Sequence, residues 1–171
     1  MRTRAPLIER CLTSKLYINP YFVEEYCDTE EKLFALILHE LHHILLGHTR
    51  LYKRVTPQHN LAFDAIINAM LSRMNPEPSW TALFREYYKP NVFPFYFLRP
   101  PVGFPDTPVY PEQMPEQHRQ ILYQLYYKNG GSFHEIFYLL CKEITIIKVP
   151  LQSGSQQSPP SSQSIQQSYG L

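Results

Sequence analysis

The segment His39-Glu40-Leu41-His42-His43 holds the residues best suited to chemistry in this chain. Its pattern is H-E-x-x-H. Residues four apart lie on one face of a helix, so the imidazoles of His39 and His43 can bind the same metal ion. Glu40 lies about 100° around the helix from His39, where its carboxylate reaches a water on the metal more easily than the metal itself. The pattern predicts a metal-dependent hydrolase site with Glu40 as general base.

A third metal ligand is needed, because catalytic zinc usually has three protein ligands and one water. Asp64 lies in an otherwise apolar helical stretch, where an unpaired carboxylate would be costly without a cation. Asn68 is one turn further on the same face and could hold the outer nitrogen of a ligand histidine. His48 is the alternative third ligand, but its spacing and that of Gly47 do not fit H-E-x-x-H-x-x-G-x-x-H. We favour Asp64.

Two helices must position these residues. Asp28-Thr29-Glu30-Glu31 predicts a helix start with Asp28 as N-cap and a glutamate at N3. The apolar periodicity that follows ends at Gly47, a natural C-terminal residue. Thr56-Pro57 predicts a second N-cap with proline at the first helical position, and the buried helix after it extends to about Arg73.

The other expected elements frame this helix pair. Lys15 to Pro20 is a short strand candidate that ends in a turn. Helices are expected over 116–128 and 132–142, separated by Asn129-Gly130-Gly131. The β-branched stretch 143–149 fits either a last helical turn or a strand.

Proline divides the rest of the chain. Ten of the 16 prolines lie between Pro76 and Pro115, which excludes one long regular element there. Because disordered linkers are poor in aromatic residues, the many rings of residues 76–115 indicate an ordered, irregular segment packed on the helices. We favour ordinary packing over a role as the wall of a cleft. Residues 150–171 are mostly Ser and Gln with no charge, so we expect a disordered tail after a domain over 1–149.

Composition excludes several classes of function. The 16 Lys and Arg against 15 Asp and Glu argue against a nucleic-acid partner, which needs a basic surface. We expect no membrane association, because no apolar run approaches the roughly 20 residues of a span. The three cysteines are odd in number and form no CxxC pair, so neither a disulfide framework nor a cysteine zinc site is expected. We expect a cytoplasmic protein.

Three segments between Leu16 and Leu71 carry a resemblance to a known family: Leu16-Tyr17-Ile18-Asn19-Pro20-Tyr21-Phe22-Val23, His39-Glu40-Leu41-His42-His43-Ile44-Leu45-Leu46-Gly47-His48 and Ala62-Phe63-Asp64-Ala65-Ile66-Ile67-Asn68. Together they resemble the bacterial metallopeptidase domain that is often found N-terminal to a von Willebrand A-like domain. The resemblance implies a Zn²⁺-dependent zincin related to the gluzincins, whose third ligand is an acidic residue on the following helix, which supports Asp64. It implies a peptide or protein substrate, and an AAA ATPase of the MoxR type and a von Willebrand A-type protein as partners. The expected fold is α+β and helix-dominated: a zincin-like helix pair carrying the metal site, a short strand or small sheet, and the irregular Pro/aromatic segment.

Alternatives to a catalytic zinc site stay open. The domain could be a non-catalytic zinc-binding scaffold of an ATPase–von Willebrand assembly, closed by His48 or His42 as fourth ligand. It could also be a regulator-cleaving zincin of the ImmA/IrrE type, or a helical domain whose histidines are merely packed. We favour a surface or capping role for His42. A second donor to the reaction's oxyanion would come from one of Tyr87, Tyr88, His118 and His134.

Overall fold

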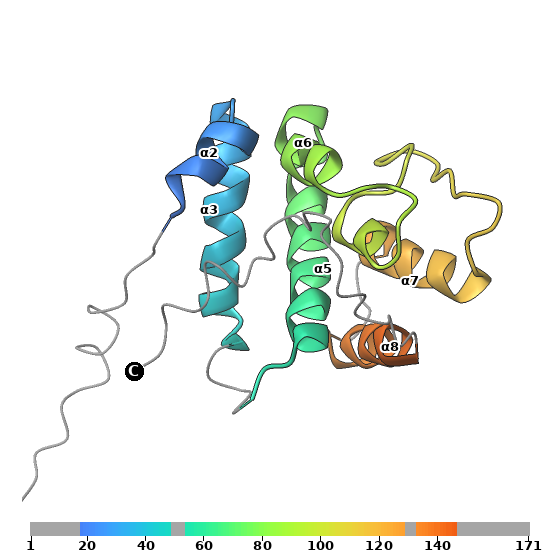
Figure 1. Cartoon of the computed structure of the whole chain (residues 1–171). Helices are drawn as coiled ribbons and strands as arrows, with labels where there is room; N and C mark the ends of the chain where they lie inside the picture. The colour runs from blue at the N-terminus through green and yellow to red at the C-terminus, as the bar shows by residue number, and fades with distance from the viewer. Residues whose placement is uncertain (1–17, 49–53, 129–132, 147–171) are drawn as a thin grey trace, which may run out of the picture.

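The computed structural model describes residues 18–48, 54–128 and 133–146, and its regular structure there is helical (Figure 1). Within these ranges the sole β-type pairing is an isolated bridge between Val102 and Val109. The helix-dominated part of the prediction is therefore confirmed, while a small sheet is not found in the described ranges. The elements are α2 (Pro20–Tyr26), α3 (Glu30–Leu45), α5 (Pro57–Met74), α6 (Pro78–Tyr87), the 3-10 helix η1 (Phe95–Leu98), α7 (Glu116–Tyr127) and α8 (Phe133–Ile146).

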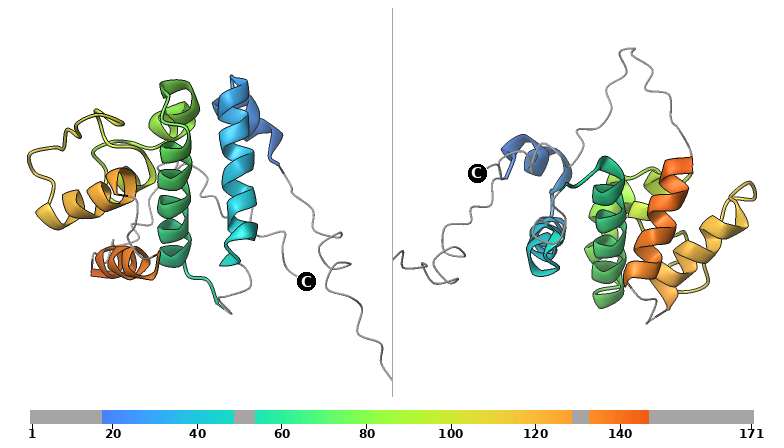
Figure 2. Two further views of the ribbon diagram at one scale, coloured as in Figure 1. Left: turned by 180° about the vertical axis from the view of Figure 1, so that it is seen from behind. Right: turned by 90° about the horizontal axis from the view of Figure 1, so that it is seen from below.

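Helix α5 is the centre of the molecule. It packs against α3 and α6 on one side and against η1, α7 and α8 on the other (Figures 1 and 2). Ala62, Ala65 and Ala69 on α5 are fully buried, and their small side chains allow the neighbouring elements to approach closely. The central position of α5 explains why its sequence is apolar on more than one face.

Two apolar clusters lie on opposite sides of α5. The smaller one joins α3, α5 and α6 and has Ala35, Leu36, Ile67, Leu71, Leu83 and Phe84 at its centre. The larger one joins α5, η1 and α7 with Leu140 of α8 and the buried rings of the Pro-rich segment. Tyr88 packs against both clusters, at the junction between them.

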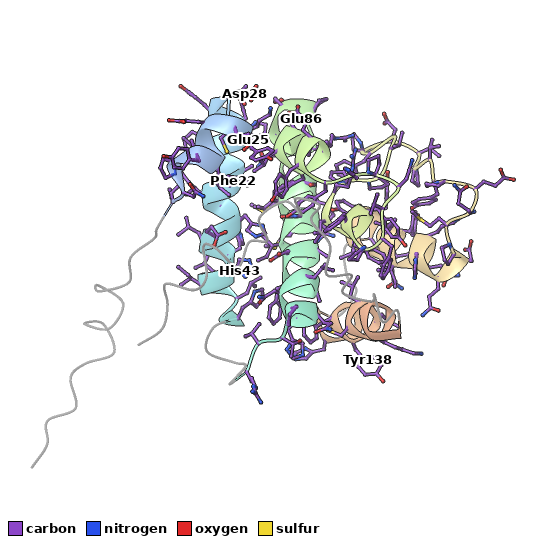
Figure 3. The ribbon with its side chains drawn as sticks, viewed as in Figure 1. Phe22, Glu25, Asp28, His43, Glu86 and Tyr138 are labelled. Carbon is purple, nitrogen blue, oxygen red and sulfur yellow. The ribbon has the colours of Figure 1, made fainter. Side chains whose placement is uncertain are left out.

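Helix α3 begins one residue later than predicted. Thr29, not Asp28, is its N-cap, and Thr29 Oγ1 accepts a hydrogen bond from the backbone N–H of Lys32 (3.3 Å). The Asp28 carboxylate instead accepts a hydrogen bond from the buried Lys32 ammonium at 2.6 Å, and Glu86 of α6 does the same at 2.6 Å. Figure 3 shows Asp28 and Glu86 at the same end of α3 and α6. The lysine thus links the start of α3 to α6.

The predicted limits of the site helices are otherwise close to the observed ones. Helix α3 ends at Leu45, and Gly47 follows with a φ of 69°, a left-handed conformation that glycine adopts without strain. At the start of α5, Thr56 accepts from the backbone of His59, whose side chain accepts from the Thr56 backbone in return. Pro57 occupies the first turn, as predicted.

The predicted strand is not present where it can be assessed. Lys15 to Tyr17 lie outside the described residues, and Asn19 and Pro20 begin helix α2. Asn19 Oδ1 accepts a hydrogen bond from the backbone N–H of Tyr21 (3.1 Å). Proline is tolerated at the first helical position because a backbone N–H there would have no partner within the helix. The Asn19-Pro20 pair therefore begins a helix and does not end a strand.

The Pro-rich segment is ordered, as predicted, but it contains regular structure. Residues Pro78–Tyr87 form helix α6, because Pro78 lies at its first position and the next proline comes only at Pro90. Arginine side chains satisfy carbonyl groups of the irregular parts: Arg85 donates to Phe104 O (2.9 Å), and Arg99 donates to Tyr88 O (2.8 Å). These bonds supply partners for carbonyl groups at positions that lie outside the helices.

The C-terminal predictions are tested in part. Residues 143–146 continue α8, which is the helical alternative of the two predicted for 143–149, and residues 147–149 lie outside the described residues. The expected disordered tail, 150–171, lies outside the described residues. Among the helices of the described ranges, none combines the length and apolar character needed to cross a bilayer.

Candidate metal centre

The structure brings His39, His43 and Asp64 together between α3 and α5. His39 Nε2 lies 3.1 Å from His43 Nε2, and Asp64 Oδ1 lies 3.1 Å from His43 Nε2 and 3.6 Å from His39 Nε2. All three side chains are buried. Figure 3 shows His43 on the side of α3 that faces α5. Among the described residues, these three form a group that could hold a metal ion.

The spacing of these three atoms fits a metal ion. Zinc binds imidazole nitrogen and carboxylate oxygen at about 2.0–2.2 Å, so two ligands of a tetrahedral ion lie about 3.3–3.6 Å apart. The three observed separations, 3.1, 3.1 and 3.6 Å, fall close to that range. The buried donor set is two imidazoles and one carboxylate, a combination that transition metals prefer over Mg²⁺ or Ca²⁺. The residues present therefore fit such an ion.

The outer nitrogen of His39 is fixed by Asn68. His39 Nδ1–H donates to Asn68 Oδ1 at 2.7 Å, which is the contact expected from the sequence. Asn68 is fully buried, and its Nδ2 donates to the carbonyl oxygen of Leu98 in η1 (2.9 Å). That second bond determines which way the amide faces. The orientation of His39 therefore depends on a chain of contacts through α5 to η1.

His48 lies at the outer side of His43 and outside the three-residue group. Its Nδ1 is 3.1 Å from His43 Nδ1, the ring nitrogen that faces away from Asp64. The His48 ring is buried and stacks on Phe63 of α5, with ring centroids 3.8 Å apart and an angle of 14° between planes. Phe63 is a site neighbour that sequence reasoning did not identify, since it is one of many apolar residues in α5.

Charges in the group stabilise one another. Burial works to raise the pKa of Asp64, but hydrogen bonds from His39 and His43 lower it below its usual range. Burial likewise works to lower the pKa of His39, yet the Asp64 carboxylate raises it above its usual value. Without metal, the site therefore favours an ion pair between His39 and Asp64. Burial, together with the charge of His43, lowers the pKa of His48 to about 4.

Glu40 and Tyr88 are two further polar residues that bear on the proposed chemistry. Glu40 is buried, 8% exposed, directly after His39 in α3. Burial raises the pKa of Tyr88 well above its ordinary value, and the negative charges of Asp64 and Glu40 raise it further. The Tyr88 hydroxyl therefore stays protonated and can donate a hydrogen bond.

The other sequence candidates lie elsewhere. His42 is half-buried and its Nδ1–H donates to Leu38 O (2.6 Å), in keeping with the ordinary role favoured for it. Tyr87 contacts Phe22 and Tyr26 of α2 through ring edges. His118 lies beside the larger apolar cluster, where its Nδ1 is 2.5 Å from the hydroxyl oxygen of Tyr96. His134 is exposed on α8.

Comparison with protein-family models, with curated proteins and with solved structures gives no match for this chain. What fold and site define is a helix-dominated domain with a buried His-His-Asp group that could hold a metal ion. Any further assignment depends on the chemistry of that group.

Proposed function

We propose that this chain is a zinc-dependent metallopeptidase that hydrolyses peptide bonds with a metal-activated water. The observation that supports the proposal is the convergence of His39, His43 and Asp64 between α3 and α5, with Glu40 adjacent. Two histidines and one carboxylate are an established ligand set of catalytic zinc, which keeps its fourth position for water. The proposal of a peptide as substrate rests on the resemblance of the three sequence segments to the bacterial metallopeptidase domain.

In this proposal each polar residue has one task. Zinc, when bound, supplies an acidified water and an electrophile for the scissile carbonyl group. The Glu40 carboxylate accepts the proton of the attacking water and then donates it to the leaving amine. The Tyr88 Oη–H donates a hydrogen bond to the oxygen on which negative charge develops. We choose Tyr88 among the four candidate donors because the charges of Asp64 and Glu40 act on it.

A non-catalytic zinc-binding module is the second candidate. The deep burial of all three ligands and of Glu40 favours it, since a substrate must reach the site. A structural zinc site is closed by four protein ligands. The number of imidazole ligands, measured by X-ray absorption from the outer-shell scattering of the rings in the zinc-loaded chain, separates the two candidates. Two imidazoles support the peptidase, and a third, from His48 or His42, supports the structural module.

The experiment that tests the peptidase compares the wild-type chain with Glu40→Gln and Glu30→Gln. Glu30 is an exposed carboxylate in the same helix and is the matched control. Zinc content by elemental analysis and cleavage of a quenched-fluorescent peptide library are measured on each. We expect one zinc per chain in all three, and a rate for Glu40→Gln that is reduced about 10²- to 10⁴-fold. A wild-type chain that binds zinc and cleaves nothing would contradict the peptidase and leave the non-catalytic module.

A further inference from the structure

The outer nitrogens of the two histidine ligands have different partners. The Nδ1 of His39 faces Asn68 Oδ1, an oxygen that can only accept. The Nδ1 of His43 faces another ring nitrogen, Nδ1 of His48, at 3.1 Å. A hydrogen bond between two nitrogens requires that one carries the proton and the other offers a lone pair. The chemistry of the metal site decides which is which.

A histidine that binds metal through Nε2 must offer the lone pair of that atom. In the neutral ring the proton then resides on Nδ1, so His43 Nδ1–H is the donor and His48 Nδ1 the acceptor. It follows that His48 carries its own proton on Nε2. The acceptor fixes both the tautomer and the rotation of the His43 ring, as carboxylates and carbonyls do in many zinc sites.

The local fold holds the acceptor in this position. Gly47, with its φ of 69°, turns the chain back at the end of α3, so that His48 returns to the face that carries His43. The His48 ring then stacks on Phe63, the residue directly before Asp64. His43, its acceptor His48 and Phe63, the residue before Asp64, therefore pack together.

We infer that His48 is a positioning residue for the metal ligand His43, holding its Nε2 lone pair toward the shared site, and not itself a ligand. This inference rests on the proposed metal site. It differs from both sequence alternatives for His48, as third ligand and as fourth ligand. Loss of the acceptor should weaken zinc binding about 10- to 100-fold, the usual effect of removing an outer partner of a ligand.

Two substitutions separate the acceptor from the packing. His48→Phe keeps an aromatic ring for stacking on Phe63 but offers no acceptor. His48→Asn loses the ring but places an oxygen on the same side-chain carbon that carries Nδ1 in histidine. His42→Phe is the matched control, because His42 is the neighbour of His43 and its Nδ1–H donates to the Leu38 carbonyl oxygen in the same helix. Zinc affinity is measured by competition with a chromophoric chelator, and thermal melting of the metal-free proteins checks that each variant folds.

We expect weaker zinc binding in His48→Phe, near wild-type binding in His48→Asn and no change in His42→Phe. Nitrogen NMR of the zinc-loaded wild type, with labelled histidine, should show His48 protonated at Nε2 and unprotonated at Nδ1. Equal affinity of His48→Phe and wild type, or a proton on His48 Nδ1, would overturn the inference. A loss in both His48 variants as large as in His43→Ala would make His48 a ligand and would also overturn it.

These outcomes are distinguishable from failure of the proposed function. A wild-type chain that binds zinc but cleaves no peptide removes the peptidase and leaves the affinity comparison intact. A wild-type chain that binds no zinc overturns both.

Discussion

Asp64 Oδ1 lies 3.1 Å from Nε2 of His43, across the interface between α5 and α3. The two residues come from different helices, and each is buried where an unpaired charge would be costly. The contact therefore couples the α3–α5 interface to the electrostatics of the candidate site. Without metal, the hydrogen bonds from His39 and His43 lower the pKa of the Asp64 carboxyl group and hold it in its charged form. A metal ion in the group would face both of these atoms.

Asp64→Ala is predicted to weaken zinc binding by more than the roughly 100-fold loss typical of an outer partner, since a ligand itself is removed. Asp106→Ala is the matched control, because Asp106 is exposed and not part of the group. Titration with zinc in the presence of a chelator gives both affinities. Equal affinities for the two variants would show that Asp64 is not a ligand.

Tyr88→Phe is predicted to lower kcat by about 100- to 1000-fold, the range measured when one donor to an oxyanion is removed. Zinc content should stay at the wild-type level, because no ligand or outer partner changes. Tyr87→Phe, which alters the neighbouring ring that packs on α2, is the control. Peptide cleavage and elemental analysis on the same samples check the prediction, and unchanged cleavage by Tyr88→Phe would remove this donor role.

Zinc binding is predicted to strengthen as pH rises. Asp64 raises the pKa of His39 above its ordinary 6.5, so in the metal-free site His39 carries a proton that must leave when its nitrogen binds metal. Affinity should increase about tenfold per pH unit up to that raised pKa, then level off. Calorimetry in two buffers of different ionisation enthalpy measures the released proton. No proton release at pH 6 would contradict the charge state assigned to His39.

The metal-free protein is predicted to show the opposite trend above pH 6.5. A histidine whose pKa is higher in the folded state gives its full stabilisation below the unfolded value, 6.5, and loses it as pH rises through the folded value. Thermal melts without metal should therefore shift to lower temperature as pH rises beyond 6.5. His39→Gln should flatten this dependence, and a slope that persists in His39→Gln would assign it to another group.

Asn68→Leu is predicted to destabilise the protein by about 1–3 kcal/mol, because the His39 Nδ1–H and the Leu98 carbonyl oxygen both lose a partner in a buried place. Asn68→Asp keeps an acceptor for His39 and loses the donor to Leu98. Because the acceptor that orients His39 remains, the Asn68→Asp protein should bind zinc more tightly than the Asn68→Leu protein. Denaturant melts and zinc titrations of the two variants test these statements, and equal zinc affinity in both would separate Asn68 from His39 function.

The candidate metal ligands could be predicted from the sequence because the geometry within a single helix is regular. A spacing of four places His39 and His43 on one face, and the cost of burying Asp64 and Asn68 in an apolar helix indicates that they have partners. Local sequence was less decisive at the start of α3, where Asp28 and Thr29 are both good caps. The Asp28 side chain pairs with Lys32, and Thr29 is the cap. Lys32 also pairs with Glu86, which lies far along the chain and is invisible to a local pattern.

Other contacts could not be predicted from periodicity. Pro78 indicated irregular structure, although at a first helical position it allows α6 to form. The return of His48 to His43 depends on one left-handed residue, Gly47, which sequence reasoning used only as a helix end. The placement of Tyr88 depends on how two apolar clusters meet, which no local pattern describes.

The position of α5 between two apolar clusters has a consequence for the kinetics of metal exchange. Helix α3 packs on the smaller cluster, while α5 is also held by the larger one. A sub-global opening that detaches α3 would leave α5 in place, separate His39 and His43 from Asp64, and expose the amides of α3. A metal ion bound to both helices would stabilise the closed state, as a cross-link does. Amide hydrogen exchange in α3 would then slow when the metal binds. The rate at which the ion itself exchanges would follow the opening rate of α3.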